Sequence, residues 1–141
     1  MNEQNNLKDM AYWPQILASV VASLIFFNHA ALTGYATEAL PQLRNETNVD
    51  VNLDEYEGSM FAAILWMIGI IASPLGGVIS SWLGRKKIFI LSAPILISGW
   101  IMIGLAQNKI LLYTGRIITS FAAGLPVPST VAYISEISHP R

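Results

Sequence analysis

Long apolar runs separated by polar links restrict the fold of this chain more than any other feature. Even the shortest run, residues 88–106, contains 19 residues. A helix rises about 1.5 Å per residue, so this length suffices to cross a hydrocarbon core of roughly 30 Å. In lipid the backbone must satisfy its own hydrogen bonds, which favours helices. We therefore expect an all-α membrane protein with four transmembrane helices. Their expected ranges are about 14–37, 58–83, 87–106 and 110–137.

The composition excludes several classes of function. Hydrophobic residues make up 53% of the chain and charged residues only 12%, whereas soluble domains carry about 25% charged residues. The formal net charge of −1 and the lack of a broad basic patch argue against nucleic-acid binding. The chain has no cysteine, and its two histidines, His29 and His139, lie at opposite ends. We therefore expect no metal site and no cofactor.

Two polar segments flank the first run. Residues 1–13 lack the basic region that begins a signal peptide, so we interpret them as a short, loosely ordered tail. Residues 14–141 then form one membrane domain. The long link at residues 37–57 is acidic and contains a glycosylation sequon, which predicts that Asn45 is glycosylated outside the cell.

The distribution of positive charge predicts the orientation in the membrane. Three adjacent cations, Arg85, Lys86 and Lys87, occupy the short link between the second and third runs. Basic residues are enriched in cytoplasmic loops, so we expect this link in the cytosol. With four crossings the N-terminal tail is then cytoplasmic as well, and the acidic link lies outside.

The second run carries small residues at helical spacing. Gly69, Ser73 and Gly77 recur at intervals of four, which would let a neighbouring helix backbone approach closely. Pro74 would bend the same helix and free a backbone carbonyl. In lipid such a bend needs neighbouring protein or cavity water, so we expect the helix to belong to a bundle.

The fourth run contains two charged residues, Arg116 and Glu136, twenty positions apart. In a helix this separation is roughly 30 Å, about one hydrocarbon thickness, so the two side chains cannot pair with each other. Arg116 lies only six residues past Ile110, so its side chain could snorkel toward the outer surface. Each charge requires a partner from another segment.

Polar or irregular positions inside the runs are candidates for a binding cavity. Pro126 and Pro128 lack amide donors and free the carbonyls four residues earlier. Free carbonyls near the membrane midplane can line a transport cavity, and a packing kink is an equal alternative. Asn28 and His29 lie inside the first run, where we favour helix–helix hydrogen bonding over contact with a ligand.

The basic link resembles a loop of the major facilitator superfamily. That loop carries glycine, three residues, an acid, often arginine, one residue, glycine and two basic residues. Gly77, Gly84, Arg85 and Lys86 match this pattern. Ser81 stands in place of the acid, which removes a charge expected to pair with another helix. The next residue, Trp82, resembles the aromatic residue that insect members of the superfamily carry at this position.

Other segments resemble the sugar porters within this superfamily. Gly115-Arg116 opens the fourth run as it does in these proteins. The pattern Tyr-x-x-Glu-x-x-x-Pro-Arg that closes the run contains Glu136. Gly34-Tyr35 is similar to the end of their first helix. The resemblance extends from about residue 12 to the end of the chain, and it is to the insect facilitated trehalose and glucose transporters in particular.

This resemblance implies a twelve-helix, two-half fold that alternates between outward-open and inward-open states. It implies that a hexose or trehalose crosses the plasma membrane by facilitated diffusion or with proton coupling. We expect this chain to be an N-terminal fragment that supplies the first four helices of the N-terminal six-helix half. Its partners would be the bilayer, the sugar and the remaining transporter helices, which hold the main sugar-contacting residues of the family.

The resemblance also implies roles for individual residues. One group would form a cytoplasmic motif and ion-pair network that stabilises the outward-facing state. This group comprises Gly77, Gly84, Arg85, Lys86 and Glu136. A second group, Gly115 and Arg116, would be structural and lie at the outer end of the fourth helix.

An enzyme is not expected. The glycines at residues 77–84 lack the Gly-Lys-Ser/Thr of a phosphate loop and follow an apolar helix rather than a strand. No Ser/His/Asp constellation is suggested at a matching depth. The alternative to transport is a tetraspan membrane protein that assembles with partner helices and transports nothing.

We expect antibody to bind an epitope tag inserted within residues 46–52 on intact cells, because the acidic link is predicted to be outside. Flow cytometry before and after permeabilisation measures this. The same tag inserted after Lys87 is the control and should become accessible only after permeabilisation. Antibody binding to the control tag on intact cells would reverse the predicted orientation.

Overall fold

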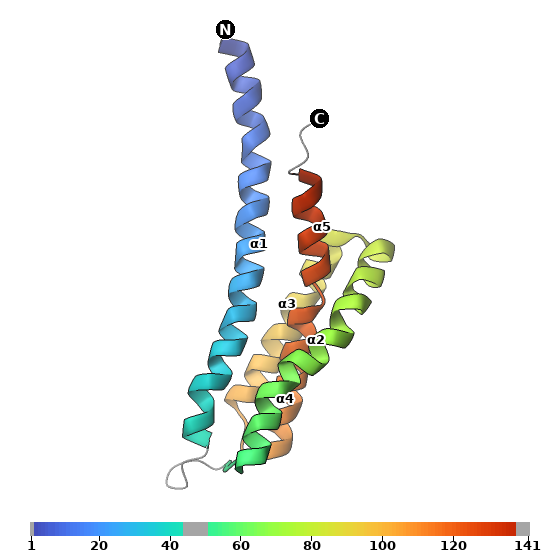
Figure 1. The fold of residues 1–141 in the computed structure, drawn as a ribbon. Coiled ribbons are helices and arrows are strands. Elements are labelled where there is room, and N and C mark those ends of the chain that lie inside the picture. Colours follow the sequence, from blue (N-terminus) through green and yellow to red (C-terminus); the bar gives the residue numbers. More distant parts are fainter. Residues whose placement is uncertain (1, 44–50, 138–141) are drawn as a thin grey trace.

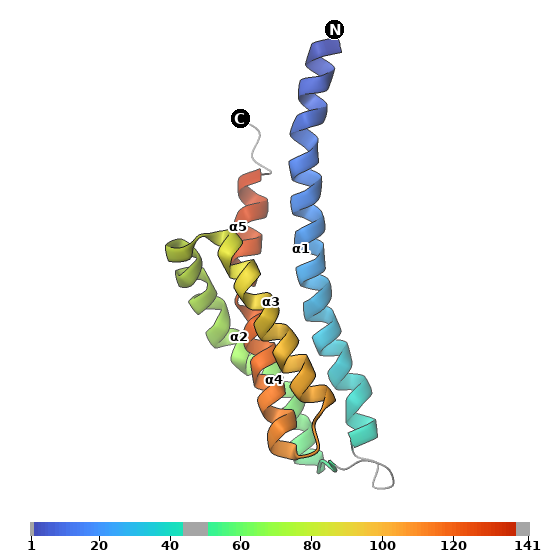
Figure 2. The same ribbon diagram turned by 180° about the vertical axis from the view of Figure 1, so that it is seen from behind.

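The computed structural model describes residues 2–43 and 51–137, and this part of the chain contains helices and no strand. Figures 1 and 2 show the helices as an elongated bundle seen from two opposite sides. The helices are α1 (Asn2–Leu43), α2 (Glu55–Leu83), α3 (Arg85–Gly104), α4 (Lys109–Gly124) and α5 (Val127–Ile137).

Four stretches within the described residues are long and apolar enough to cross a bilayer. They are Ser19–Leu43, Glu55–Leu83, Arg85–Gly104 and Lys109–Ala132. The all-α, four-span fold class predicted from the sequence is thereby confirmed. Helices α2 and α3 also lie within three residues of their predicted ranges.

Helix α1 begins earlier than predicted. It is continuous from Asn2 to Leu43, where the sequence predicts a loosely ordered tail over residues 1–13. No glycine or proline occurs before Pro14, so no residue in this segment interrupts the helical backbone. The N-terminal part of α1 therefore extends past the other helices, as both views show (Figures 1 and 2).

The fourth predicted span is divided into two helices. Helix α4 ends at Gly124 and α5 begins at Val127, whereas the sequence predicts one kinked helix over residues 110–137. Pro126 and Pro128 cannot donate to the carbonyls four residues earlier, which interrupts the hydrogen-bond ladder. The ladder resumes where the Thr130 amide donates to the Pro126 carbonyl over 2.9 Å.

Helices α2 and α3 are joined by a single residue, Gly84. Its backbone has φ 87° and ψ 146°, a region that is essentially restricted to glycine. Its amide donates to the Ser80 carbonyl over 3.0 Å and so caps α2. This junction lies toward the same end of the bundle as the start of α1 and the end of α5 (Figure 1). The α3–α4 turn lies at the other end.

A network of side chains fixes the start of α2. Asp54 and Glu57 form a capping box, in which the Asp54 carboxylate accepts from the Glu55 amide over 2.8 Å. Glu57 also accepts from Lys109 Nζ over 2.6 Å, and the Tyr113 hydroxyl donates to the Glu57 carbonyl over 2.6 Å. The first turns of α2 and α4 are therefore tied together at this end of the bundle.

Helices α3 and α4 approach closely at two glycines. A Cβ atom added to Gly99 would lie 2.6 Å from Thr119 Cγ2 and 3.1 Å from the Gly115 carbonyl oxygen. A Cβ atom added to Gly115 would lie 2.8 Å from Ile103 Cγ1. Gly115 therefore has a packing role.

Helix α2 crosses α4 at the point where the fourth span breaks. A Cβ atom added to Gly76 would overlap the Leu125 carbonyl, and one added to Gly124 would lie 2.8 Å from Ala72 Cβ. The prediction that Gly77 belongs to the close-packed row is wrong, because no atom lies within 4 Å of its Cβ position. The helix turns by about 100° per residue, so it is the neighbouring glycine that faces α4.

We expect Gly76→Ala to lower the free energy of unfolding by about 1–3 kcal/mol, because the new methyl group displaces backbone at the break. Gly77→Ala adds the same methyl group to open space one residue away. It should leave stability within about 0.5 kcal/mol of the wild type, or slightly above it. Reversible unfolding in mixed micelles measures both variants. Equal stabilities would contradict the packing described here.

Candidate functional site

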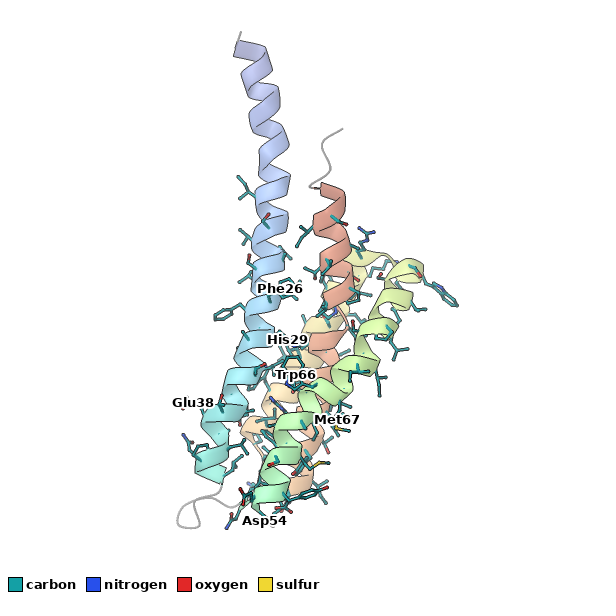
Figure 3. The ribbon with its side chains drawn as sticks, in the orientation of Figure 1. Phe26, His29, Glu38, Asp54, Trp66 and Met67 are labelled. Carbon is teal, nitrogen blue, oxygen red and sulfur yellow. The ribbon has the colours of Figure 1, made fainter. Side chains whose placement is uncertain are left out.

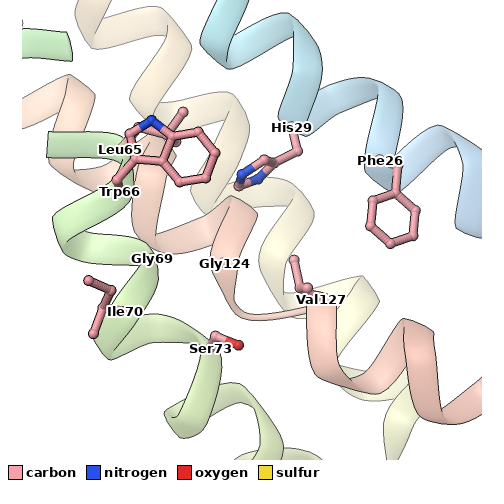
Figure 4. Close-up of a pocket in the computed structure, with 9 residues that line it drawn as sticks. All are labelled: Phe26, His29, Leu65, Trp66, Gly69, Ile70, Ser73, Gly124 and Val127. Carbon is pink, nitrogen blue, oxygen red and sulfur yellow. The ribbon is translucent and has the colours of Figure 1, made fainter. Parts of the chain in front are cut away.

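A cavity of about 310 Å³ lies where α1 and α2 face the break between α4 and α5 (Figure 4). Its walls are mostly apolar, and they include backbone exposed at two glycines. The lining residues are Phe26, His29, Leu65, Trp66, Gly69, Ile70, Ser73, Gly124 and Val127. The cavity therefore draws on segments far apart in the sequence, and the interrupted fourth span forms one of its walls.

The imidazole of His29 is the principal polar group in this cavity. It projects from α1 toward Trp66 on α2 (Figures 3 and 4). The two rings are 5.9 Å apart between centroids with an interplanar angle of 74°, an edge-to-face arrangement. Its Nδ1 atom is buried and has no hydrogen-bond partner among the described residues. His29 thus lies on the cavity wall.

The other predicted cavity residues take different positions. Asn28 is half-buried but does not line the cavity, and neither do Pro126 and Pro128. The prolines act on the wall indirectly, because the break that they cause sets Gly124 and Val127 on either side of a turn. Four predicted candidates therefore yield one lining residue, His29.

Arg116 lies inside the bundle rather than at its surface. Its side chain is fully buried, and its Nη1 donates to the Leu32 carbonyl of α1 over 3.0 Å. The guanidinium carbon lies 5.0 Å from the centroid of the Phe61 ring, a cation–π contact. Arg116 does not snorkel to the surface, because its guanidinium points toward α1 and α2. The guanidinium thus has the Leu32 carbonyl and the Phe61 ring as partners. Its Nε and Nη2 atoms have no hydrogen-bond partner among the described residues.

The basic link is described in part. Gly84 joins α2 to α3, Arg85 is half-buried, and Lys86 is exposed. Glu136 belongs to α5, but its side chain lies outside the described residues, as does Asn45. The ion-pair network and the glycosylation site therefore stay predictions.

Several residues of the site escaped sequence reasoning. Trp66 lies in the middle of a span, whereas tryptophan is enriched at membrane interfaces. This unusual position could have marked Trp66 as a candidate site residue in the sequence. Phe61 gave no signal, because an apolar residue in an apolar run is expected at any depth. Both aromatic rings contact a polar side chain of another helix.

The chemistry of the cavity suits a neutral ligand. The described residues that line it include no Asp, Glu, Lys or Arg. Within residues 2–43 and 51–137 there is no group of three His, Cys, Asp or Glu side chains that could hold a metal ion. An aromatic ring, an imidazole and the Ser73 hydroxyl offer packing and a few hydrogen bonds, which is the usual composition of a small-molecule site.

Comparison with known families identifies the class of protein. The family profile described as "Sugar (and other) transporter" matches residues 15–141, nearly the whole chain. The chain belongs to the sugar transporter family. This membership confirms the resemblance to the sugar porters of the major facilitator superfamily.

Curated relatives of this sugar transporter family member come from mammals, insects and plants. Facilitated glucose transporter member 8 of Bos taurus is 34% identical over 89% of this chain and 26% of its own length. The facilitated trehalose transporter Tret1 of Aedes aegypti is 26% identical over 92% of this chain and 16% of its own length. The sugar transporter ERD6-like 16 of Arabidopsis thaliana is 28% identical over 97% of this chain and 28% of its own length.

The chain therefore spans between 16% and 28% of the length of these relatives. No solved structure matches it.

We expect Arg116→Met to loosen the attachment of α1 to α4 in this family member, because a hydrogen bond from a charged donor contributes about 1.5–3 kcal/mol. The chain has no cysteine, so spin labels at Ala31→Cys and Ile117→Cys report on these two helices without background. Double electron–electron resonance should show a broader distance distribution in Arg116→Met. Lys109→Met, which removes a cation that contacts α2, is the control and should leave the distribution unchanged. A sharp distribution in Arg116→Met would contradict the role of this contact.

Proposed function

We propose that this chain forms four membrane-spanning segments of a transporter that moves a hexose or trehalose by alternating access. The match of the sugar transporter profile to residues 15–141 carries the proposal. The printed names of the relatives supply the sugars, glucose and trehalose. No enzymatic activity is proposed.

The position of the cavity supports this function. It lies partway along the bundle, against the interruption of the fourth span (Figure 3). Interrupted helices near the membrane midplane are a recurrent feature of transporter binding sites, because they leave backbone groups and space that a continuous helix would fill. Of the two alternatives for Pro126 and Pro128, a cavity wall or a packing kink, we adopt the first. The prolines shape the wall by breaking the fourth span, although they do not line the cavity themselves.

We place the basic link in the cytosol and the protein in the plasma membrane. In this orientation the N-terminus is cytoplasmic and Asn45 is on the outside, where glycosylation takes place. Gly77, Gly84, Arg85 and Lys86 then form the cytoplasmic motif. We propose that Arg85 and Glu136 act there as an ion-pair network that favours the outward-facing state.

We propose further transporter helices as partners of this chain. The described helices expose large apolar side chains, among them Phe27, Trp82 and Ile90, as expected for surfaces that contact lipid or other helices. The fully buried Arg116 has two nitrogens, Nε and Nη2, without a hydrogen-bond partner among the described residues. A tetraspan protein that only assembles with partners is not favoured, since every relative named above is a transporter.

The proposal is tested by joining the chain to the segment that follows the matched region in the bovine relative. We expect proteoliposomes with this chimera to take up radiolabelled glucose or trehalose. Liposomes with the chain alone should take up neither sugar, because the other half of the pathway is absent. The complete bovine protein and empty liposomes are the positive and negative controls. A folded chimera that moves neither sugar would refute the proposed function, and uptake by the chain alone would refute the need for further helices.

A further inference from the structure

The junction between α2 and α3 carries positive charge that the described residues do not neutralise. Lys86 and Lys87 are exposed, and neither forms an ion pair within the described part of the chain. The sequence contains no Asp or Glu between Glu57 and Glu136. Helices α3 and α4 therefore contain no acid, and the acids of α2 lie at its opposite end.

The local backbone adds to this positive potential. The two lysines belong to the first turn of α3, which contains no acidic residue and has no side-chain cap at Gly84. The amide groups at the start of a helix carry a partial positive charge, so cations placed there are destabilising unless an anion lies close by. An anion supplied from outside the chain would offset this repulsion.

The junction lies at the level of the lipid headgroups. The spans Glu55–Leu83 and Arg85–Gly104 are separated by Gly84 alone, so both leave the hydrocarbon at this point. Trp82 is 85% exposed directly before the junction, and tryptophan is enriched at this depth. A one-residue connection is too short to extend into the aqueous phase. The two lysines are therefore held beside phospholipid headgroups.

Exposed apolar stripes run from the junction along both helices. On α2 the stripe ends at Trp82 and has intervals of four, three and four residues, and on α3 it begins at Lys86 and has intervals of four, seven and four. In a helix these intervals place the side chains on one face. The exposed apolar members are Ile71, Leu75 and Val78 on α2 and Ile90, Ile97 and Ile101 on α3. Such a stripe suits acyl chains whose headgroups lie at the junction.

We propose that Lys86 and Lys87 form a docking surface for anionic phospholipid headgroups, with the acyl chains packed along the stripes on α2 and α3. The partner is identified by charge complementarity and depth: its phosphate or carboxylate oxygens accept from the two ammonium groups. The choice of the cytoplasmic leaflet rests on the orientation given under the proposed function. The choice of an anionic lipid rests on the charge, the burial and the depth of the junction.

The test measures lipid contact at the junction of the full chain in phosphatidylcholine nanodiscs. The chain has no cysteine, so Ser81→Cys, at an exposed position, carries a single nitrobenzoxadiazole fluorophore. Phosphatidylserine or phosphatidylcholine with a nitroxide at acyl carbon 5 is then added as a quencher. We expect phosphatidylserine to reach half-maximal quenching at a mole fraction about fivefold lower or less, since one cation beside an anionic lipid contributes roughly that factor.

Charge variants of the labelled chain identify the residues responsible. Lys86→Gln combined with Lys87→Gln should abolish the preference for phosphatidylserine, whereas Lys86→Arg combined with Lys87→Arg should keep it. Lys109→Gln removes a cation at the other end of the bundle and should leave the preference unchanged. Raising the salt concentration should weaken the preference, because both lysines are exposed to solvent. Circular dichroism checks that each variant is as helical as the wild type.

A depth measurement tests the position of the junction independently. Phosphatidylcholine with the nitroxide at carbon 5 should quench the fluorophore more strongly than the same lipid labelled at carbon 12. Stronger quenching from carbon 12 would place the junction inside the hydrocarbon and overturn the proposal.

The remaining outcomes separate this inference from other partners and from transport. Equal quenching by the two lipids, or a preference that survives the double glutamine substitution, would refute the docking surface. Binding of a soluble hexaglutamate peptide to the chain, with no preference for phosphatidylserine, would assign the surface to an acidic protein segment instead. Both leaflets of a nanodisc have the same composition, so the result depends neither on the proposed orientation nor on sugar uptake by the chimera.

Discussion

Close backbone contact between helices is the constraint on which the arrangement depends. Gly76 and Gly124 bring α2 onto α4, and Gly99 and Gly115 bring α3 onto α4. As a result the fourth span is the central helix of the bundle. Of the residues in its most apolar stretch 56% are buried, against 17–22% in the other three spans. In lipid such packing replaces the hydrophobic effect as the force between helices, so a single methyl group at these positions matters.

Several buried polar atoms of this span and of α1 have no partner among the described residues. The atoms without partners among the described residues are His29 Nδ1, Ser129 Oγ, and Nε and Nη2 of Arg116. They come from α1 and from the two halves of the fourth span, and none comes from α3. Polar atoms at membrane depth that lack protein partners face a hydrated cavity, a ligand or another helix. Arg116 is one such group on the side of the fourth span that faces α1, where the Leu32 carbonyl accepts its hydrogen bond.

The sequence predicted the spans and the break better than the contacts between them. Hydropathy and length suffice for the four spans, and missing amide donors predict the break at Pro126. The facing residues depend on how each helix is rotated about its axis, which neighbouring helices decide. This is why Gly76 rather than Gly77 touches α4. It is also why Arg116 points inward although its depth would have allowed it to reach the surface.

The cavity shows the same limit and adds a connection that the sequence could not reveal. His29 is recognisable in the sequence as a polar residue in an apolar run, but its neighbour Trp66 comes from another helix. Leu32 lies one helical turn from His29, and its carbonyl accepts the hydrogen bond from Arg116. Arg116 is thus linked to His29 through three residues of the α1 backbone, although Arg116 itself does not line the cavity.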